Sequence, residues 1–441
     1  MDSQTSYVTN VAEQFELSGD KDWLQRQKQS CEAALAYLLT RDTNHNHLVE
    51  MANSLTSQRR SSDWLDIVWA SYENAFVNAQ LYGALNKWAF DESLLGDAAK
   101  AKEYTDFAAA LKESFNKPIS EGGFWNPDKG WYVYWRDADG KTHGDNLTVP
   151  INLTAICEGI CDDPARVKQL LGTIETKMNA ESLLSWPACF ESYQPGEGMD
   201  DKFPKYENGD IFLAWAGFGV RAYAGYDPTI ALKYVKKIAA QYDKDGLAFQ
   251  RYLRANGQGA GDDILANNCN VITGLYRDVY GIQPRYNRLF ISPHLVHELD
   301  GTVLNYPYHG ERLKIGLSVG DYSVADGGLV VKSDVPFGVQ FKNHEATLFA
   351  VRSNDPAFSV HARSTDSLSA EIIDWSASNT FKLTAGANGA QAHLTFYGLL
   401  KGHTYHLMKN GAAVATMTGE SPTATVDLRS KETASFELQP S

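Results

Sequence analysis

The chain has 441 residues, of which 43% are apolar, and its formal net charge is −14. This length exceeds that of one ordinary domain and the apolar content can fill a sizeable core, so we expect two domains. The negative charge, without a run of Lys and Arg that could follow a phosphate backbone, argues against nucleic acid and anionic membranes as partners.

The amino-terminal segment MDSQTSYVTN has neither a basic start nor an apolar stretch. Since no run of roughly eighteen apolar residues occurs either, we expect no signal peptide and no membrane span in the sequence as written. The location is therefore open between the cytoplasm and, after removal of a leader, the periplasm or the medium.

Helical spacing of apolar residues dominates up to about residue 286, and the predicted helices come in pairs. The predicted pairs are 7–17 with 23–39, 67–90 with 97–115, 149–160 with 164–178, and 211–224 with 228–242, followed by a last helix over 264–280. The pairs share no short repeat, which disfavours a solenoid.

Long connections rich in aromatic residues, carboxylates, Gly and Pro follow alternate helices, over 52–66, 117–148, 181–209 and 243–263. Long loops gathered at one end of a rigid scaffold are where function collects. This arrangement favours a helical toroid with a functional mouth.

The pattern changes to short alternating strands after residue 286, and Asn410-Gly411 predicts a tight hairpin turn. We therefore predict a helical-hairpin toroid over 1–286, catalytic, and an antiparallel β-sandwich over 287–441. The sandwich is either one module or two small β modules that divide near residue 365.

Five cysteines occur, an odd number, in apolar or helical contexts and without the short paired spacing of zinc sites. We expect them to be free and buried. Only three histidines precede residue 287, too few for a convincing metal site, and no Gly-rich phosphate loop, HExxH or G-x-S-x-G motif is present. No metal and no cofactor are expected.

Aromatic residues cluster in the predicted mouth loops, most densely in FWNPDKGWYVYWRDADG. Flat rings beside hydrogen-bonding groups suit sugars, whose apolar ring faces stack while their hydroxyls need donors and acceptors. Burial in a core is the alternative for any single ring. The candidate substrate-binding residues are Trp64, Trp125, Trp131, Trp135, Trp186, Tyr206 and Asn208.

Carboxylates also occur in several of the predicted loops. Glycoside cleavage needs an acid for the leaving oxygen and a base or nucleophile on the opposite face, and two carboxyl groups from separate loops can supply them. For each carboxylate the alternative is a helix cap or a solvated acid. The candidates are Asp63 and Asp66 in SSDWLD, Glu191 in FESYQPGEGMDD, Glu207 in KYENGD and Asp262 in QGAGDD.

Several longer runs resemble six-hairpin (α/α)6-barrel glycoside hydrolases, a group with α-L-rhamnosidases, trehalases, α-glucosidases and debranching-enzyme-like proteins. The resemblance covers roughly residues 10 to 315 and implies an oligosaccharide or glycoside as the partner. It rests on YLLTRDTNHNHLVE, SSDWLDIVWASYENAFVNAQLYGALNKWA, FWNPDKGWYVYW, KYENGDIFLAW and NNCNVITGLYRDVYGIQPRYNRLFISPHL.

The same resemblance implies roles for three carboxylates. It implicates Asp66 first and Asp63 second as the general acid, and Asp262 as the base that activates water. The expected reaction is inverting, exo-acting hydrolysis, with Glu207 or Glu191 as replacements if the first pair does not face across the mouth.

Two departures from the group matter. Members often carry Glu at the base position, and Cys269 stands near their usual His. We also expect about nine long helices where a closed toroid of this group has about twelve. Either segments interpreted as loops build the missing hairpin, or an absent amino-terminal portion or a second subunit supplies it.

Three alternatives remain open at this stage. A disaccharide phosphorylase of the same fold would need an anion pocket beside the acid. A non-catalytic glycan-binding protein or inactive fragment would bind sugar without turnover, and a polysaccharide lyase would use Tyr and His chemistry.

Overall fold

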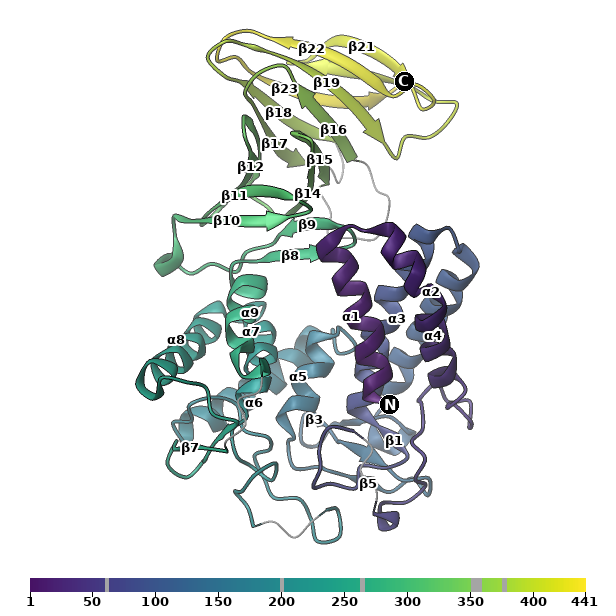
Figure 1. The fold of residues 1–441 in the computed structure, drawn as a ribbon. Helices are drawn as coiled ribbons and strands as arrows, with labels where there is room; N and C mark the ends of the chain where they lie inside the picture. The colour runs from purple at the N-terminus through teal and green to yellow at the C-terminus, as the bar shows by residue number, and fades with distance from the viewer. Residues whose placement is uncertain (60–62, 199–201, 262–265, 350–358, 375–378) are drawn as a thin grey trace. The chain divides into compact units, whose positions relative to one another are not determined.

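A computed structural model describes residues 1–59, 63–198, 202–261, 266–349, 359–374 and 379–441. The chain divides into a helical unit, Met1–Gln14 with Asp20–Val279, and a β unit, Phe15–Gly19 with Tyr280–Ser441 (Figure 1). The predicted helical region followed by a β-sandwich is confirmed. No helix in the described ranges is long and apolar enough to cross a membrane.

The helical unit is built from pairs of helices in chain order. Its α-helices are α1 (Asp2–Ser18), α2 (Lys21–Leu39), α3 (Ala75–Leu95), α4 (Ala98–Asn116), α5 (Val149–Cys157), α6 (Pro164–Ala180), α7 (Ala216–Ala224), α8 (Pro228–Asp245) and α9 (Asn270–Gly274). A π-helical turn, η5 (Leu275–Val279), continues α9. Short 3₁₀ turns cover Thr56–Gln58, Ile119–Glu121, Leu213–Trp215 and Ala266–Cys269.

Alternate helices form an inner row, because α3 packs on α5, α5 on α7 and α7 on α9. Their partners α4, α6 and α8 pack outside them. The burial pattern agrees with this arrangement: α3 and α5 are buried on nearly every side, whereas α4, α6 and α8 bury one face each. Inner and outer helices in alternation are the toroid layout expected from the paired periodicity.

Helix α1 connects the two ends of the inner row. Its Glu13 carboxylate lies 3.2 Å from Lys87 Nζ on α3 and 3.4 Å from Arg277 Nη1 on η5. Nearer its start, Thr5 donates a hydrogen bond to Gln80 of α3 at 3.0 Å. In the described residues the inner ring therefore has five segments, α1, α3, α5, α7 and α9–η5.

The helix predicted from residue 67 begins only at Ala75. Residues before it are extended, because the Ile67 N–H is bound by Glu207 and Val68 forms a β-bridge with Gly198. A Cβ at Gly198 would lie 2.0 Å from the Ile67 carbonyl oxygen, so only glycine allows this approach. Tertiary contacts thus override helical periodicity at this point.

Short strands support the loops of the helical unit. They are β1 (Glu73–Asn74), β2 (Trp125–Asn126), β3 (Trp131–Tyr132), β4 (Trp135–Arg136), β5 (Thr142–His143), β6 (Arg251–Tyr252) and β7 (Gly259–Ala260). They pair as β1-β4-β5, β2-β3 and β6-β7.

The β unit is a sandwich of a nine-stranded sheet, β10-β11-β12-β13-β17-β18-β23-β20-β21, and a seven-stranded sheet, β22-β19-β16-β15-β14-β9-β8. Alternating burial along the strands supplies one shared apolar core. Both sheets contain strands from before and after residue 365. All pairings among the described strands are antiparallel except β13 with β17, which is parallel and so departs from the all-antiparallel prediction.

The strands of the sandwich lie between residues 282 and 440. They are β8 (Ile282–Arg285), β9 (Arg288–Ile291), β10 (Thr302–Tyr308), β11 (Glu311–Ser318), β12 (Asp321–Asp326), β13 (Leu329–Ser333), β14 (Phe337–Lys342), β15 (Glu345–Phe349), β16 (Ser359–Ser364), β17 (Leu368–Asp374), β18 (Thr380–Ala385), β19 (Ala390–Tyr397), β20 (Thr404–Lys409), β21 (Ala412–Thr418), β22 (Thr423–Leu428) and β23 (Thr433–Pro440).

The predicted hairpin at Asn410-Gly411 joins β20 and β21, and both turn residues have positive φ, 50° and 83°. This is the backbone that Asn-Gly adopts at low cost. The cysteines are all free, as predicted, but only four are buried, because Cys269 is exposed.

Lys28 on α2 compensates a cluster of three carboxylates. Its ammonium lies 2.7 Å from Glu32, 2.5 Å from Glu92 and 3.2 Å from Asp97. Burial opposes the charge on Lys28, but its hydrogen bonds to the three carboxylates raise its pKa. The Glu92 side chain is fully buried, so its charge depends on this lysine.

We expect Lys28→Met to lower the free energy of unfolding by about 3 kcal/mol, because it leaves Glu92 buried without its cation. The measurement is urea denaturation. Lys100→Met, which removes the exposed Lys100–Glu103 pair, is the matched control and should cost about 0.5 kcal/mol or less. Equal effects of the two substitutions would contradict this interpretation.

Candidate active site

A cavity of about 760 Å³ lies inside the helical unit. Its walls come from α1, α3, α7, α9 and η5, together with residues of the loops before α3, α7 and α9. This volume falls in the range of small-molecule sites, roughly 300–1,000 Å³. The cavity is therefore large enough for a short saccharide.

One wall is aromatic. The Trp64 ring lies 4.4 Å from Trp215 and 6.0 Å from Phe76, and Trp215 lies 5.4 Å from Phe218, all between ring centroids. All four rings line the cavity, as does Tyr206. Such a wall presents flat apolar faces of the kind that pack against sugar rings.

Glu207 is a buried carboxyl group on the cavity wall with a strongly raised pKa. The residue is 4% exposed, and burial, with the nearby negative charges of Asp66 and Asp63, raises its pKa to about 8. Two backbone N–H groups, of Asp66 and Ile67, donate to its Oε2 at 2.9 and 3.2 Å and only partly offset this effect. Glu207 therefore carries a proton at neutral pH.

A tight turn aims Glu207 at the cavity. Tyr206 and Gly209 have positive φ, 54° and 120°, and Lys205 and Asn208 exchange backbone hydrogen bonds. The Asp210 carboxylate accepts from the Tyr206 N–H at 2.7 Å and holds the turn. The ENGD sequence thus fixes the carboxyl group rather than leaving it on a mobile loop.

Asp66 and Asp63 have different surroundings. Asp66 is exposed and lines the cavity next to Glu207. Asp63 is not among the lining residues: its Oδ2 accepts hydrogen bonds from Tyr134 and Asn74, both at 2.7 Å. Burial raises the pKa of Asp63 to about 6 in spite of these bonds.

Charged residues form another part of the cavity wall. Arg277 pairs with Glu13 at 3.4 Å, and Arg221 lies 3.9 Å from Asp278. Burial opposes ionisation of Glu13, but Lys87 and Arg277 hold its pKa down at about 2. Each arginine is thus matched by an acid, and the wall is polar without a net basic patch.

Four of the predicted sugar-binding tryptophans are buried away from the cavity lining. Trp125 packs under Arg166, Trp131 donates to Asp145 at 2.9 Å, and Trp186 stacks on Tyr223. Their contacts are those of core aromatics, the alternative considered from the sequence.

Trp135, the fourth of these tryptophans, packs against a buried histidine outside the cavity lining. Its ring stacks on His143 at 5.3 Å. The two ring nitrogens of His143 lie 3.2 Å from Asp137 and 3.2 Å from Glu197. This arrangement fastens the β4–β5 hairpin to the loop that bridges Val68.

The remaining predicted residues lie as follows. Glu191 is exposed and faces Lys177 at 3.5 Å, outside the lining residues. Asn208 is buried, where its side chain accepts from the Tyr193 N–H at 3.2 Å. Asp262 falls outside the described residues.

Residues not selected from the sequence also line the cavity, chiefly Trp215, Arg221, Arg277 and one polar face of α1. Trp215 stands eight residues after Glu207, within KYENGDIFLAW. The segment that indicated Glu207 as a candidate therefore also contains Trp215. The α1 face, which includes Thr5, Thr9 and Asn10, has helical spacing. Polar residues at that spacing look like a solvated surface, so no local signal distinguishes them.

No protein-family profile and no curated protein matches the chain. Solved structures with a similar fold include a family 78 rhamnosidase of Bacillus sp. GL1, at 14% identity and a TM-score of 0.45, over 75% of this chain and 31% of that one. A family 63 mannosylglycerate hydrolase from Thermus thermophilus matches at 14% identity and 0.48, over 62% and 74%.

An α-L-rhamnosidase from Dictyoglumus thermophilum matches at 12% identity and a TM-score of 0.45, over 99% of this chain and 39% of that one. The chain thus spans about a third of the length of the rhamnosidases. These proteins belong to the glycoside hydrolase group that the sequence resembles, and the likeness concerns the fold.

Proposed function

We propose that this chain hydrolyses a glycosidic bond in the cavity of its helical unit. The observation that carries the proposal is Glu207, a buried carboxyl group on the cavity wall whose pKa is raised to about 8. A general acid must hold its proton at the pH of the reaction, and burial beside a second carboxylate is how proteins achieve this.

In this proposal Glu207 protonates the leaving oxygen. The sequence resemblance favours Asp66 for that role, but Asp66 is exposed, and its negative charge helps to keep the proton on Glu207. Asp262 remains the proposed base that activates water for inversion. A carboxyl separation of about 6.5–9.5 Å between acid and base would agree with inversion.

The side chains of the cavity wall indicate the class of substrate. The rings of Trp64, Trp215 and Tyr206 support stacking of a sugar, and the polar side chains of α1 can bind its hydroxyl groups. We propose exo-action on an oligosaccharide or glycoside, which release of single units rather than a ladder of products would support.

The test is a screen of nitrophenyl glycosides and oligosaccharides in buffer without phosphate. We expect hydrolysis that added phosphate does not accelerate, because both cavity arginines face acidic partners. Turnover only with phosphate would identify a phosphorylase instead. Saturable glycan binding without any turnover would contradict the enzyme assignment and leave a glycan-binding protein.

A further inference from the structure

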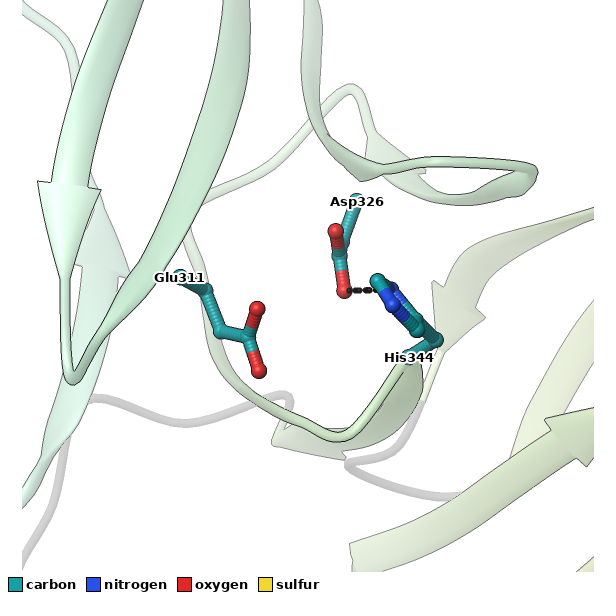
Figure 2. Close-up of side chains that lie close together, drawn as sticks. All are labelled: Glu311, Asp326 and His344. Carbon is teal, nitrogen blue, oxygen red and sulfur yellow. Dashed lines mark hydrogen bonds and ion pairs between the residues drawn. The ribbon is translucent and has the colours of Figure 1, made fainter.

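Three side chains that the proposed reaction does not use meet in the β unit. Glu311 begins β11, Asp326 ends β12, and His344 lies in the turn between β14 and β15. Figure 2 shows them pointing toward one another, and one ligand atom of each lies within 4.8 Å of the other two. Glu311 and Asp326 come from the nine-stranded sheet, whereas His344 connects strands of the seven-stranded sheet.

The hydrogen bonds of the group leave ligand positions open. Asp326 Oδ2 lies 2.9 Å from His344 Nδ1, and Glu311 Oε1 accepts from the Asn343 N–H at 3.0 Å. The second oxygens, Glu311 Oε2 and Asp326 Oδ1, have no hydrogen bond within the described part of the chain. Asp326 is only 6% exposed as a residue, so its position in the sandwich is fixed by packing.

Charge compensation distinguishes this group from the other carboxylate cluster of the chain. Glu32, Glu92 and Asp97 also come within 4.8 Å of one another, but Lys28 lies among them. Among the described residues no lysine or arginine forms an ion pair with Glu311 or Asp326. Within the described ranges, Asp326 therefore has the His344 imidazole as its side-chain partner, and Glu311 has no cationic partner.

We propose that Glu311, Asp326 and His344 bind one divalent transition-metal ion, with Zn²⁺ the best suited. One imidazole nitrogen and two carboxylate oxygens form a donor set that this ion accepts. The ion would take the place of the proton between His344 Nδ1 and Asp326 Oδ2, and that proton would pass to solvent. Bonds from Zn²⁺ to nitrogen and oxygen are roughly 2.0–2.2 Å long, so binding would draw the three ligand atoms closer together than the 4.8 Å limit.

Such an ion would join the two sheets of the sandwich, because its ligands come from both. We therefore expect Zn²⁺ to raise the melting temperature of the chain. This role is independent of the reaction proposed for the helical unit, so either proposal can fail alone.

The test is isothermal titration of the EDTA-treated full chain with ZnCl₂, with the visible spectrum of the Co²⁺ form as a second readout. We expect one ion per chain. His344→Ala and Glu311→Gln should each weaken binding at least tenfold and abolish the Co²⁺ absorption. His361→Ala is the matched control, because His361 pairs with Glu345 at 2.8 Å and no third ligand joins them among the described residues. This variant should bind as the unaltered chain does.

Loss of folding should not obscure the result, since the His344 side chain is 77% exposed. In EDTA the melting temperature of the His344→Ala chain serves as that variant's own baseline, and added Zn²⁺ should not raise it. No binding by the unaltered chain, binding of Ca²⁺ but not Zn²⁺, or equal affinity in His344→Ala would each overturn the proposal.

Discussion

Glu207→Gln is expected to reduce turnover of unactivated oligosaccharides by roughly 10²–10⁴-fold, because an amide cannot protonate the leaving oxygen. Nitrophenyl glycosides, whose leaving groups need little protonation, should lose much less. The amide oxygen can still accept from the Asp66 and Ile67 N–H groups, so the local structure should persist. Steady-state kinetics on the two substrate classes measures the difference.

The same substitution should stabilise the chain at neutral and alkaline pH. The Glu207 pKa is about 8 in the folded chain against an ordinary value of 4.5, so the folded chain binds the additional proton between these values. Stability therefore falls as pH rises from about 4.5 to about 8. At pH 7 this cost is roughly 3 kcal/mol, which Glu207→Gln removes.

Urea denaturation of both chains at pH 4 and pH 8 checks this expectation. The gain from Glu207→Gln should be present at pH 8 and nearly absent at pH 4. Lys205→Gln, on the same turn, changes a residue outside the cavity lining and serves as the control. Loss of stability at pH 8 would mean that the pKa of Glu207 is not raised in the folded chain, which contradicts its role as acid.

Asp262→Asn is expected to reduce turnover by about 10³-fold or more on both substrate classes, because activation of water is needed whatever the leaving group. Azide, a nucleophile that needs no base, should restore turnover of nitrophenyl glycosides and give a glycosyl azide of inverted configuration.

Asp263→Asn, which removes the next carboxylate in QGAGDD, provides the matched control for that substitution. It should keep most of the activity. If Asp262→Asn remains active while another loop carboxylate proves essential, the assignment of Asp262 is wrong, although the role of Glu207 is unaffected.

The fold followed from the sequence where periodicity and local signals agreed. Paired helical spacing predicted α1 to α8, although α3 and α7 begin eight and five residues later than expected, and Asn410-Gly411 predicted its hairpin. The prediction was wrong at residues 67–74, where the backbone pairs with Glu207 and Gly198 from distant loops. The ion pairs of Glu13 could not be foreseen either, because their partners Lys87 and Arg277 lie far along the chain.

The candidate site was predictable in part. Trp64, Asp66, Tyr206 and Glu207 were selected from loop segments and do line the cavity. In the segment densest in aromatic residues, rings such as Trp135 are buried and do not line the cavity. The sequence resemblance ranked Asp66 above Glu207 as the acid. Our proposal reverses that order, since the raised pKa of Glu207 comes from burial that only the folded chain provides.

The pH dependence of kcat/KM on an oligosaccharide tests the central claim most directly. With Glu207 as the acid, activity should fall on the alkaline side with a midpoint at about 8, as its proton is lost. Asp66→Asn should move that midpoint to lower pH, because the charge of Asp66 raises the pKa of Glu207. Activity that stays constant to about pH 10, or a midpoint that Asp66→Asn leaves in place, would contradict the account.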